Sequence, residues 1–171
     1  MTDRDTAFAE YFAARSDAMR GTAYLLCGDW HRAEDLTQTA LTKLYLAWHR
    51  GNRHEVLDAY VRQMLVRTFL DERRLSWWRR VRVTDRPLDG APGTWDTEPE
   101  ERITLFAALA KVPARQRAVL ILRYWEDLSV EETANLLGCS AGTVKSQSAR
   151  GLQTLRHHMT MSHEPAMRES S

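Results

Sequence analysis

The stretch Leu128-Ser-Val-Glu-Glu-Thr-Ala-Asn-Leu-Leu-Gly-Cys-Ser-Ala-Gly-Thr-Val-Lys-Ser146 predicts a helix-turn-helix, and it decides how the C-terminal part of this chain folds. Ser129 is of a residue type that caps helices, and Glu132 follows three positions later, as a capping box requires. Gly138 provides the turn between the two helices. Val144 then returns an apolar side chain to the core from the second helix.

The second helix of this motif is predicted to run from Ala141 to about Arg156, and Ala134 is small where the two helices would cross. It carries Lys145 and Arg150 with hydroxyl and amide side chains between them, and it contains no acidic residue. A short, polar and basic helix presented by a tight turn suits the major groove of DNA. An ordinary helical hairpin is the alternative that this pattern leaves open.

The charges of the chain are segregated along the sequence, although the formal net charge is only +1. The segment from Tyr60 to Arg82 contains seven arginines and only two acids, Asp71 and Glu72. Four acids then lie between Asp96 and Glu101. A basic segment, an acidic one and a basic helix form a charge pattern that favours nucleic-acid binding.

Helical periodicity dominates the N-terminal part, and no convincing alternating strand pattern occurs. Apolar residues recur in three segments with the spacing of one buried helix face. The predicted helices cover residues 8–26, ending near Gly28, then 31–48 and 55–78. A polar loop containing Gly51 separates the second helix from the third.

Residues 82–99 break this pattern, because they are poor in apolar side chains and contain three prolines and two glycines. They predict a flexible linker. After it, helices are predicted at Ile103–Val112 and Pro113–Trp125, with Pro113 at the first helical position, and the helix-turn-helix follows. The predicted fold is all-α, with two small helical domains at 5–81 and 100–157 joined by the linker. A polar tail at 158–171 completes the chain.

Several classes of protein are not indicated by the composition. The chain has two cysteines, Cys27 and Cys139, and no CxxC pair, so neither a disulfide framework nor a zinc finger is predicted. The first residues are polar and charged, which argues against a signal peptide. No apolar run approaches the roughly 18 residues of a membrane helix. We therefore expect a cytoplasmic protein without membrane insertion, metal or cofactor.

Two motifs resemble one known family. Val112-Pro-Ala-Arg-Gln-Arg-Ala-Val-Leu-Ile-Leu-Arg-Tyr-Trp-Glu-Asp-Leu-Ser129, with Gly142-Thr-Val-Lys-Ser146 and Arg150-Gly-Leu-Gln-Thr-Leu-Arg156, resembles region 4 of bacterial sigma factors. Ala33-Glu-Asp-Leu-Thr-Gln-Thr-Ala-Leu-Thr-Lys-Leu-Tyr-Leu-Ala-Trp48 resembles their region 2. With these two regions and a linker, the chain is similar to the extracytoplasmic-function (ECF) group over roughly residues 5–157. Trp77-Trp78 among arginines is similar to its actinobacterial SigE-like branch.

The resemblance implies a function without catalysis. Sigma factors bind core RNA polymerase and direct it to promoters, with region 4 reading the −35 element and region 2 the −10 element. The implied partners are promoter DNA, the clamp helices of the largest polymerase subunit for region 2, and the flap region for the C-terminal domain. An anti-sigma factor is a further partner that many relatives have.

The resemblance places polymerase binding on Asp35, Gln38 and Thr42. These residues share the polar face of the predicted helix 31–48 with Thr39 and Leu46. Many relatives have an acid where Thr39 stands, so we expect a weaker charge contribution at that position. An ordinary solvated helix face is the alternative interpretation.

The resemblance places −10 reading on the arginine-rich segment and on the loop before it. Unstacked bases need aromatic or guanidinium platforms, and arginines also suit phosphates. Relatives often have Asn where Arg67 stands, so we expect Arg67 to contact DNA by charge. For the tryptophans the alternative is that one covers the core while the other is merely exposed. The candidates are Asn52, Arg53, His54, Arg67, Arg73, Arg74, Trp77, Trp78, Arg79 and Arg80.

In the C-terminal domain the resemblance places −35 reading at the front of the second helix of the motif. We expect Lys145 and Gln147 at base edges. Ser148 follows Val144 by four positions, which leaves open whether it faces DNA or the core. The candidates are Ser140, Gly142, Thr143, Lys145, Ser146, Gln147, Arg150 and Arg123, with Ser140, Ser146, Arg150 and Arg123 assigned to phosphate.

Two rival classes remain for comparison. A stand-alone helix-turn-helix regulator would explain the C-terminal motif but would leave the region 2 motif unexplained. An enzyme is disfavoured, because no phosphate-binding Gly-rich loop or nucleophile elbow occurs. Cys27 and His31 are four positions apart but lack a third well-spaced metal ligand, and the remaining histidine cluster, His157, His158 and His163, lies in a polar tail.

Overall fold

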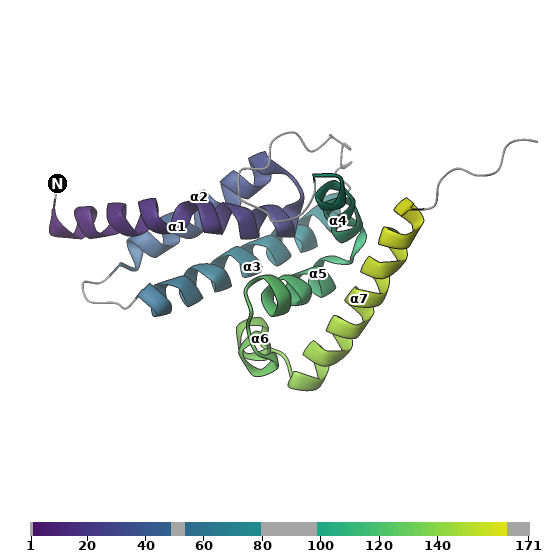
Figure 1. Cartoon of the computed structure of the whole chain (residues 1–171). Helices are drawn as coiled ribbons and strands as arrows, with labels where there is room; N and C mark the ends of the chain where they lie inside the picture. The colour runs from purple at the N-terminus through teal and green to yellow at the C-terminus, as the bar shows by residue number, and fades with distance from the viewer. Residues whose placement is uncertain (1, 49–53, 80–98, 164–171) are drawn as a thin grey trace, which may run out of the picture. The chain divides into compact units, whose positions relative to one another are not determined.

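The computed structural model describes residues 2–48, 54–79 and 99–163, with backbone only at 54, 76–79, 99 and 163. It divides the chain into two compact units, Met1–Gly93 and Thr94–Ser171, here called the N-terminal and C-terminal units. Every element within the described ranges is helical, which confirms the predicted all-α class (Figure 1). The division falls inside the predicted linker, 82–99.

The N-terminal unit consists of three helices, α1 (Asp3–Cys27), α2 (Trp30–Leu46) and α3 (His54–Arg79), each in contact with the other two. Thr2 caps α1 in a capping box with Asp5, and Gly28 ends it with a left-handed φ of 70°. The Asp29 side chain caps α2 by accepting from the Arg32 backbone N–H at 3.0 Å. The predicted boundaries at residues 31 and 48 therefore shift by one or two positions.

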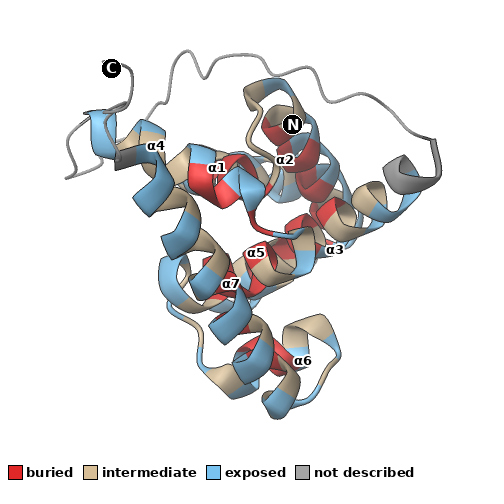
Figure 2. Cartoon of the chain, turned by 90° about the vertical axis from the view of Figure 1, so that its right-hand side faces the viewer, coloured by how far each residue is buried: buried red, intermediate tan, exposed pale blue. Residues whose placement is uncertain are grey.

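The core of this unit lies where the three helices face one another (Figure 2). Leu36, Ala40 and Leu44 of α2 are buried, as their helical spacing predicts. Across the core, the buried Tyr11 hydroxyl donates to Asp58 Oδ1 at 2.7 Å and joins α1 to α3. This bond satisfies the hydroxyl of a buried phenol.

The C-terminal unit consists of α4 (Pro99–Lys111), α5 (Ala114–Leu120), the π-helical turn η1 (Ile121–Trp125), α6 (Val130–Leu137) and α7 (Ala141–His163). Helices α4, α5 and α6 all pack against α7. At Gly151 of α7, an added Cβ would lie 3.1 Å from the Leu120 side chain of α5. A glycine at this position lets α5 and α7 come together.

The single helix predicted at Pro113–Trp125 was wrong in two respects. Pro113 is the N-cap of α5 with an extended ψ of 143°, so the first helical position belongs to Ala114. The α-helix then gives way at Ile121 to the π-helical turn, in which the Glu126 N–H donates to the Ile121 carbonyl at 2.9 Å. Such a turn inserts an extra residue that apolar spacing over so short a segment does not reveal.

Helix α1 begins five residues before the predicted start at residue 8, and two boundaries of the C-terminal unit also differ from prediction. Helix α4 begins at Pro99, the last residue assigned to the linker, because proline is well tolerated in the first helical turn. Helix α7 continues past the predicted end at Arg156 to His163, into the predicted polar tail. No glycine or proline lies between His157 and Ser162 to end it, and its polar composition does not prevent helix formation.

Candidate functional site

The turn of the helix-turn-helix is built as predicted. The Ser129 hydroxyl accepts from the Glu132 N–H at 3.0 Å, while the Glu132 carboxylate accepts from the Ser129 N–H at 2.8 Å. Gly138 adopts a left-handed φ of 66° and ends α6. Two backbone donors at the start of α6 therefore have local partners, and the left-handed Gly138 lets the chain reverse at the end of the helix.

Packing then sets the angle at which α7 leaves this turn. Val119 of α5, Ala134 of α6 and Val144 of α7 form one buried cluster, with Val130 and Leu137 packed against it. The predicted roles of Ala134 and Val144 are thereby confirmed. Because Val144 is fully buried, the next residue, Lys145, is directed toward the outside, and it is exposed.

The predicted −35 residues on α7 lie together on its first turns. Ser140, Gly142, Lys145, Ser146 and Arg150 are exposed, while Thr143 and Gln147 are half-buried. Ser148 is buried, so the open question about this residue is decided in favour of the core.

The hydroxyls of Ser140, Thr143 and Ser146 already have local partners. Ser140 Oγ accepts from the Thr143 N–H at 3.1 Å, as the cap of α7. Ser146 Oγ donates to the Thr143 carbonyl at 3.0 Å. A phosphate accepts hydrogen bonds, so Ser146 can donate to one only when its hydroxyl leaves the Thr143 carbonyl. The Ser140 hydroxyl can donate outward when the Thr143 hydroxyl is the donor in their 2.9 Å contact.

Arg123 is the predicted −35 residue that lies away from α7 and its cap. Its guanidinium donates to the Leu128 carbonyl and lies over the Tyr124 ring, 5.8 Å from the centroid. It therefore ties the π-helical turn to the start of the helix-turn-helix. This contact gives Arg123 a structural role, and its assignment to phosphate stays a prediction.

The predicted polymerase-binding residues lie on one exposed face of α2. Asp35, Gln38, Thr39 and Thr42 are exposed, and Leu46 retains 74% of its accessible surface. The opposite face of the helix is buried. The sequence therefore predicted correctly which side of α2 is exposed.

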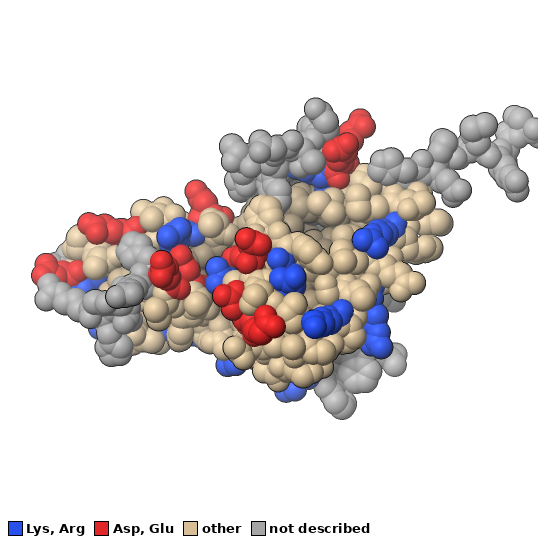
Figure 3. All heavy atoms as spheres, turned by 60° about the horizontal axis from the view of Figure 1, so that its bottom comes forward, with Lys and Arg blue, Asp and Glu red and all other residues tan. Residues whose placement is uncertain are grey.

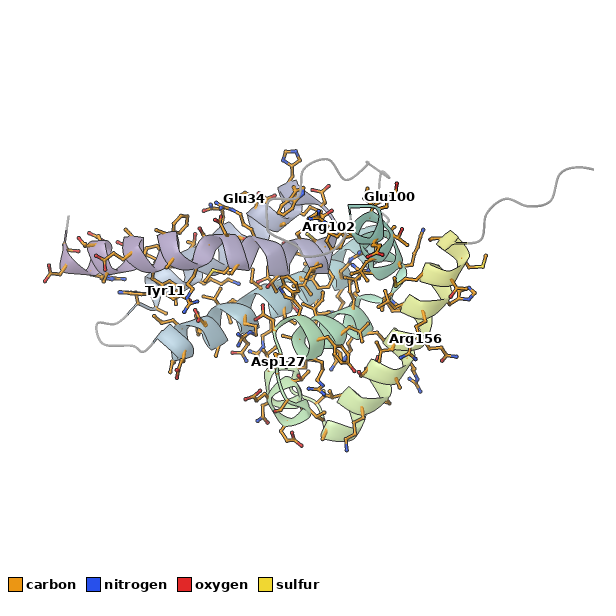
Figure 4. The ribbon with its side chains drawn as sticks, viewed as in Figure 1. Tyr11, Glu34, Glu100, Arg102, Asp127 and Arg156 are labelled. Atoms are coloured by element: carbon orange, nitrogen blue, oxygen red, sulfur yellow. The ribbon has the colours of Figure 1, made fainter. Side chains whose placement is uncertain are left out.

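A polar network that the sequence analysis missed borders this face. Arg20 of α1 contacts both carboxylate oxygens of Glu34, with Nε at 2.7 Å from Oε2 and Nη2 at 3.3 Å from Oε1. Hydrogen bonds from Arg20 and then from Gln38 hold the pKa of Glu34 below its ordinary value. Glu34 is labelled in Figure 4, which shows it in the N-terminal unit beside α1 and α2. The sequence signal was the Glu34–Gln38 spacing of one helical turn; the partner on α1 had none.

The predicted −10 arginines of α3 differ in their surroundings. Arg67 and Arg74 are exposed, whereas Arg73 is half-buried with its guanidinium 5.8 Å from the Phe69 ring centroid. Burial, and then the neighbouring Arg32 guanidinium, lower the pKa of Arg73. Arg67 and Arg74 are thus the described arginines of this set that a nucleic acid can reach freely.

The remaining −10 candidates lie outside the described residues or side chains. The structure does not describe Asn52, Arg53 or Arg80. For His54, Trp77, Trp78 and Arg79 it describes the backbone but not the side chain. Their roles stay predictions. The described backbone places residues 76–79 in the last part of α3.

The distribution of charged, metal-ligating and apolar side chains adds three observations. Basic and acidic side chains lie next to one another on the face shown in Figure 3. Among the described residues, no group of three or more His, Cys, Asp or Glu side chains is arranged to hold a metal ion. In the same part of the chain, no helix combines the length and apolar content that a membrane crossing needs.

Comparison with known families assigns both units. Residues 12–79 match the family "Sigma-70 region 2", and residues 102–155 match "Sigma-70, region 4". The chain is 38% identical over 156 residues to the RNA polymerase sigma-E factor of Streptomyces coelicolor, covering 89% of this chain and 85% of that relative. It is 30% identical over 157 residues to the ECF RNA polymerase sigma factor SigE of Mycolicibacterium smegmatis, covering 88% of this chain and 60% of that relative.

A solved structure also has this fold. The sigma factor RpoE from Bartonella quintana, crystallised with the anti-sigma factor NepR, superposes with a TM-score of 0.69 at 24% identity. The match covers 92% of this chain and 99% of that one. At this identity the likeness concerns the fold.

Proposed function

Because this chain belongs to the ECF group of RNA polymerase sigma factors, we propose that its two helical units divide promoter recognition between named faces of α2, α3 and α7. As a sigma factor it has no enzymatic activity; its partners are core RNA polymerase and promoter DNA. It directs transcription initiation at specific promoters. The proposal concerns which residues carry each task, and it places this work in the cytoplasm, where polymerase and promoters are found.

The first turns of α7 read the −35 element. The observation that supports this most directly is the alternation at Val144 and Lys145, one buried in the α5–α6–α7 cluster and the other exposed beside it. Packing thereby holds the front of α7 at a fixed angle to α6, as insertion into a major groove requires. Lys145 and Gln147 contact base edges, while Ser140, Ser146 and Arg150 contact phosphates.

The end of α3 and the segment around it bind the −10 element. Arg67 and Arg74 are exposed on α3 and supply phosphate contacts. The aromatic platforms for unstacked bases are assigned to Trp77 and Trp78. Arg73 contributes less than its neighbours, since it is half-buried against Phe69.

The exposed face of α2 binds core polymerase at the clamp helices of the largest subunit, and the C-terminal unit binds its flap region. Asp35, Gln38 and Thr42 supply the polar contacts on α2, since all three are exposed on one side of the helix. An anti-sigma factor is proposed as a competing partner for these surfaces. It would keep the factor inactive by covering them.

Run-off transcription tests the proposed function. A genomic promoter library is transcribed by core polymerase with the wild-type chain, with Lys145→Ala, with Asp35→Ala, or without the chain. We expect start sites that depend on the wild-type chain and share two upstream motifs at fixed spacing. Lys145→Ala should weaken use of the −35 motif, and Asp35→Ala should require more protein for the same yield. Specific DNA binding by the chain alone, with no new start sites, would instead support a stand-alone regulator.

A further inference from the structure

Arg20 is fixed by three contacts at the boundary between α1 and α2. Two of its nitrogens contact the two carboxylate oxygens of Glu34, at 2.7 and 3.3 Å. Its third nitrogen, Nη1, contacts Asp17 Oδ1 at 3.0 Å. Two parallel contacts to one carboxylate fix the plane of both groups, which a single lysine contact does not.

The same carboxylate holds a residue of the proposed polymerase-binding face. Glu34 Oε1 accepts from Gln38 Nε2 at 3.2 Å, one helical turn along α2. The Thr42 hydroxyl, one turn further, donates to the backbone carbonyl of Gln38 at 2.8 Å. The side-chain donor of Thr42 and one amide donor of Gln38 are thus turned back onto their own helix.

The groups left for a partner are mainly acceptors. Within the described part of the chain, no hydrogen bond or ion pair engages the Asp35 carboxylate or the side-chain carbonyl oxygen of Gln38. Thr42 keeps its hydroxyl lone pairs. Glu34, by contrast, is already occupied by Arg20 and Gln38. The face therefore presents several oxygen acceptors beside the second amide hydrogen of Gln38 and the Thr39 hydroxyl, and Asp35 carries its negative charge that is not paired with Arg20.

From this geometry we propose that Arg20 is a positioning residue for polymerase binding, which acts through Glu34 to hold the Gln38 amide with its carbonyl oxygen available to the polymerase. The proposal rests on the proposed role of the α2 face. It assigns a donor-rich, basic surface to the polymerase side of this contact. Arg20 itself makes no contact with the polymerase in this scheme.

A second arginine of α1 provides a matched control. Arg15 Nη2 lies 3.3 Å from Asp58 Oδ2 and ties α1 to α3. Arg15 and Arg20 thus belong to the same helix and each pairs with an acid on another helix. Asp58 lies on α3, so this pair has no link to Gln38. Arg15→Gln consequently reports the effect of losing an interhelical ion pair alone.

A double-mutant cycle on affinity for core polymerase tests the proposal with the full-length chain. The dissociation constant is measured for wild type, Arg20→Gln, Gln38→Ala, the double variant, Arg15→Gln and Asp35→Ala. We expect Arg20→Gln and Gln38→Ala each to weaken binding by about 3- to 10-fold, as loss of one hydrogen bond implies. The double variant should bind core polymerase no more weakly than the single variant of lower affinity. Arg15→Gln should bind like wild type.

Three results would overturn the proposal. If the two substitutions multiply their effects, Arg20 acts independently of Gln38. If Arg15→Gln weakens binding as much as Arg20→Gln at a similar loss of thermal stability, the effect is general destabilisation. If Gln38→Ala and Asp35→Ala both bind like wild type, the α2 face itself is excluded and the positioning role falls with it. A weakened Asp35→Ala together with multiplying effects would retain the proposed face and remove only the role of Arg20.

Discussion

The guanidinium of Arg117 donates to the backbone carbonyl of Val112, from Nη2 at 2.8 Å and from Nε at 3.3 Å. The same Nη2 contacts the Ala110 carbonyl at 3.0 Å. Arg117 is only 3% exposed, so a side chain of α5 closes the end of α4 from inside the C-terminal unit. Carbonyls at a helix C-terminus lack intrahelical partners, and a cation there also complements the helix dipole.

Arg117→Met should destabilise the C-terminal unit by about 2–3 kcal/mol, because it leaves the buried Val112 carbonyl and the Ala110 carbonyl without this charged donor. Hydrogen exchange of peptides from α4 and α5 measures the unfolding free energy of this unit separately from the other. Arg115→Met is the control, since Arg115 is exposed on the same helix. Equal exchange rates in Arg117→Met and Arg115→Met would contradict this role of Arg117 at the end of α4.

Asp127→Gly should stabilise the same unit by about 0.5–1 kcal/mol. Asp127, labelled in Figure 4, has a φ of 55° in the turn before α6, a conformation that costs any residue with a Cβ. Asp127→Val should instead destabilise the unit, because a β-branched side chain fits the left-handed region of backbone conformation worst. Hydrogen exchange of α6 provides the measurement. A stabilised valine variant would show that the turn can adopt another conformation.

Cys27 should react slowly with alkylating reagents in the folded chain. Burial raises the pKa of its thiol to about 11, and its Sγ donates to the Asp29 carbonyl at 3.2 Å. On the order of 0.1% is then thiolate at pH 8, and the thiolate is the reactive form. In a Cys139→Ser background, the iodoacetamide rate should rise with pH toward that pKa and should increase in urea. Equal rates in the native and unfolded chains at pH 8 would refute this.

The N-terminal unit should lose stability in acid partly through Glu34. Hydrogen bonds from Arg20 and Gln38 lower the pKa of Glu34 in the folded state. A depressed folded-state pKa stabilises the fold above the ordinary glutamate pKa, and this contribution is lost as the pH falls through the folded value. The free energies of unfolding of wild type and Glu34→Gln, measured in urea, should therefore differ most near neutral pH and become equal in acid. A difference that is constant with pH would point to packing instead.

Lys145 and Arg150 should affect promoter binding in different ways. Lys145→Ala should lower discrimination at the −35 element by about 1–3 kcal/mol, the value of a specific base contact. Arg150→Ala should weaken binding to all sequences and reduce the log–log salt slope by about 0.9, because it removes one phosphate contact. Holoenzyme affinities at several salt concentrations, on promoters from the run-off experiment, distinguish the two. Gln153→Ala, exposed further along α7, should change neither quantity.

Local signals made the helix-turn-helix predictable. The capping box at Ser129 and Glu132, the left-handed Gly138 and the buried Val144 each depend on residues a few positions apart. The buried and exposed faces of α2 likewise follow from helical spacing. The π-helical turn at Ile121–Trp125 was missed because its extra residue leaves the apolar pattern almost unchanged.

Arginine roles were the least predictable part of the candidate sites. In the sequence Arg20, Arg73, Arg117 and Arg123 look alike, as basic residues on helices. The structure gives them four different surroundings: a bidentate carboxylate, an aromatic ring, two helix-end carbonyls and a loop carbonyl. Each depends on a neighbour brought close by packing, and a long side chain can reach several such neighbours.

The sequence by itself determined the helices, their caps and the two family regions, because these depend on spacing within one helix or turn. Only the tertiary structure decided which polar side chains remain available to polymerase and DNA. Arg20 and Glu34 are 14 positions apart and lie on different helices, yet their contact leaves Asp35 as the acid without a partner on the described α2 face. Such pairing depends on how helices pack, since that packing sets which charges come within hydrogen-bonding distance.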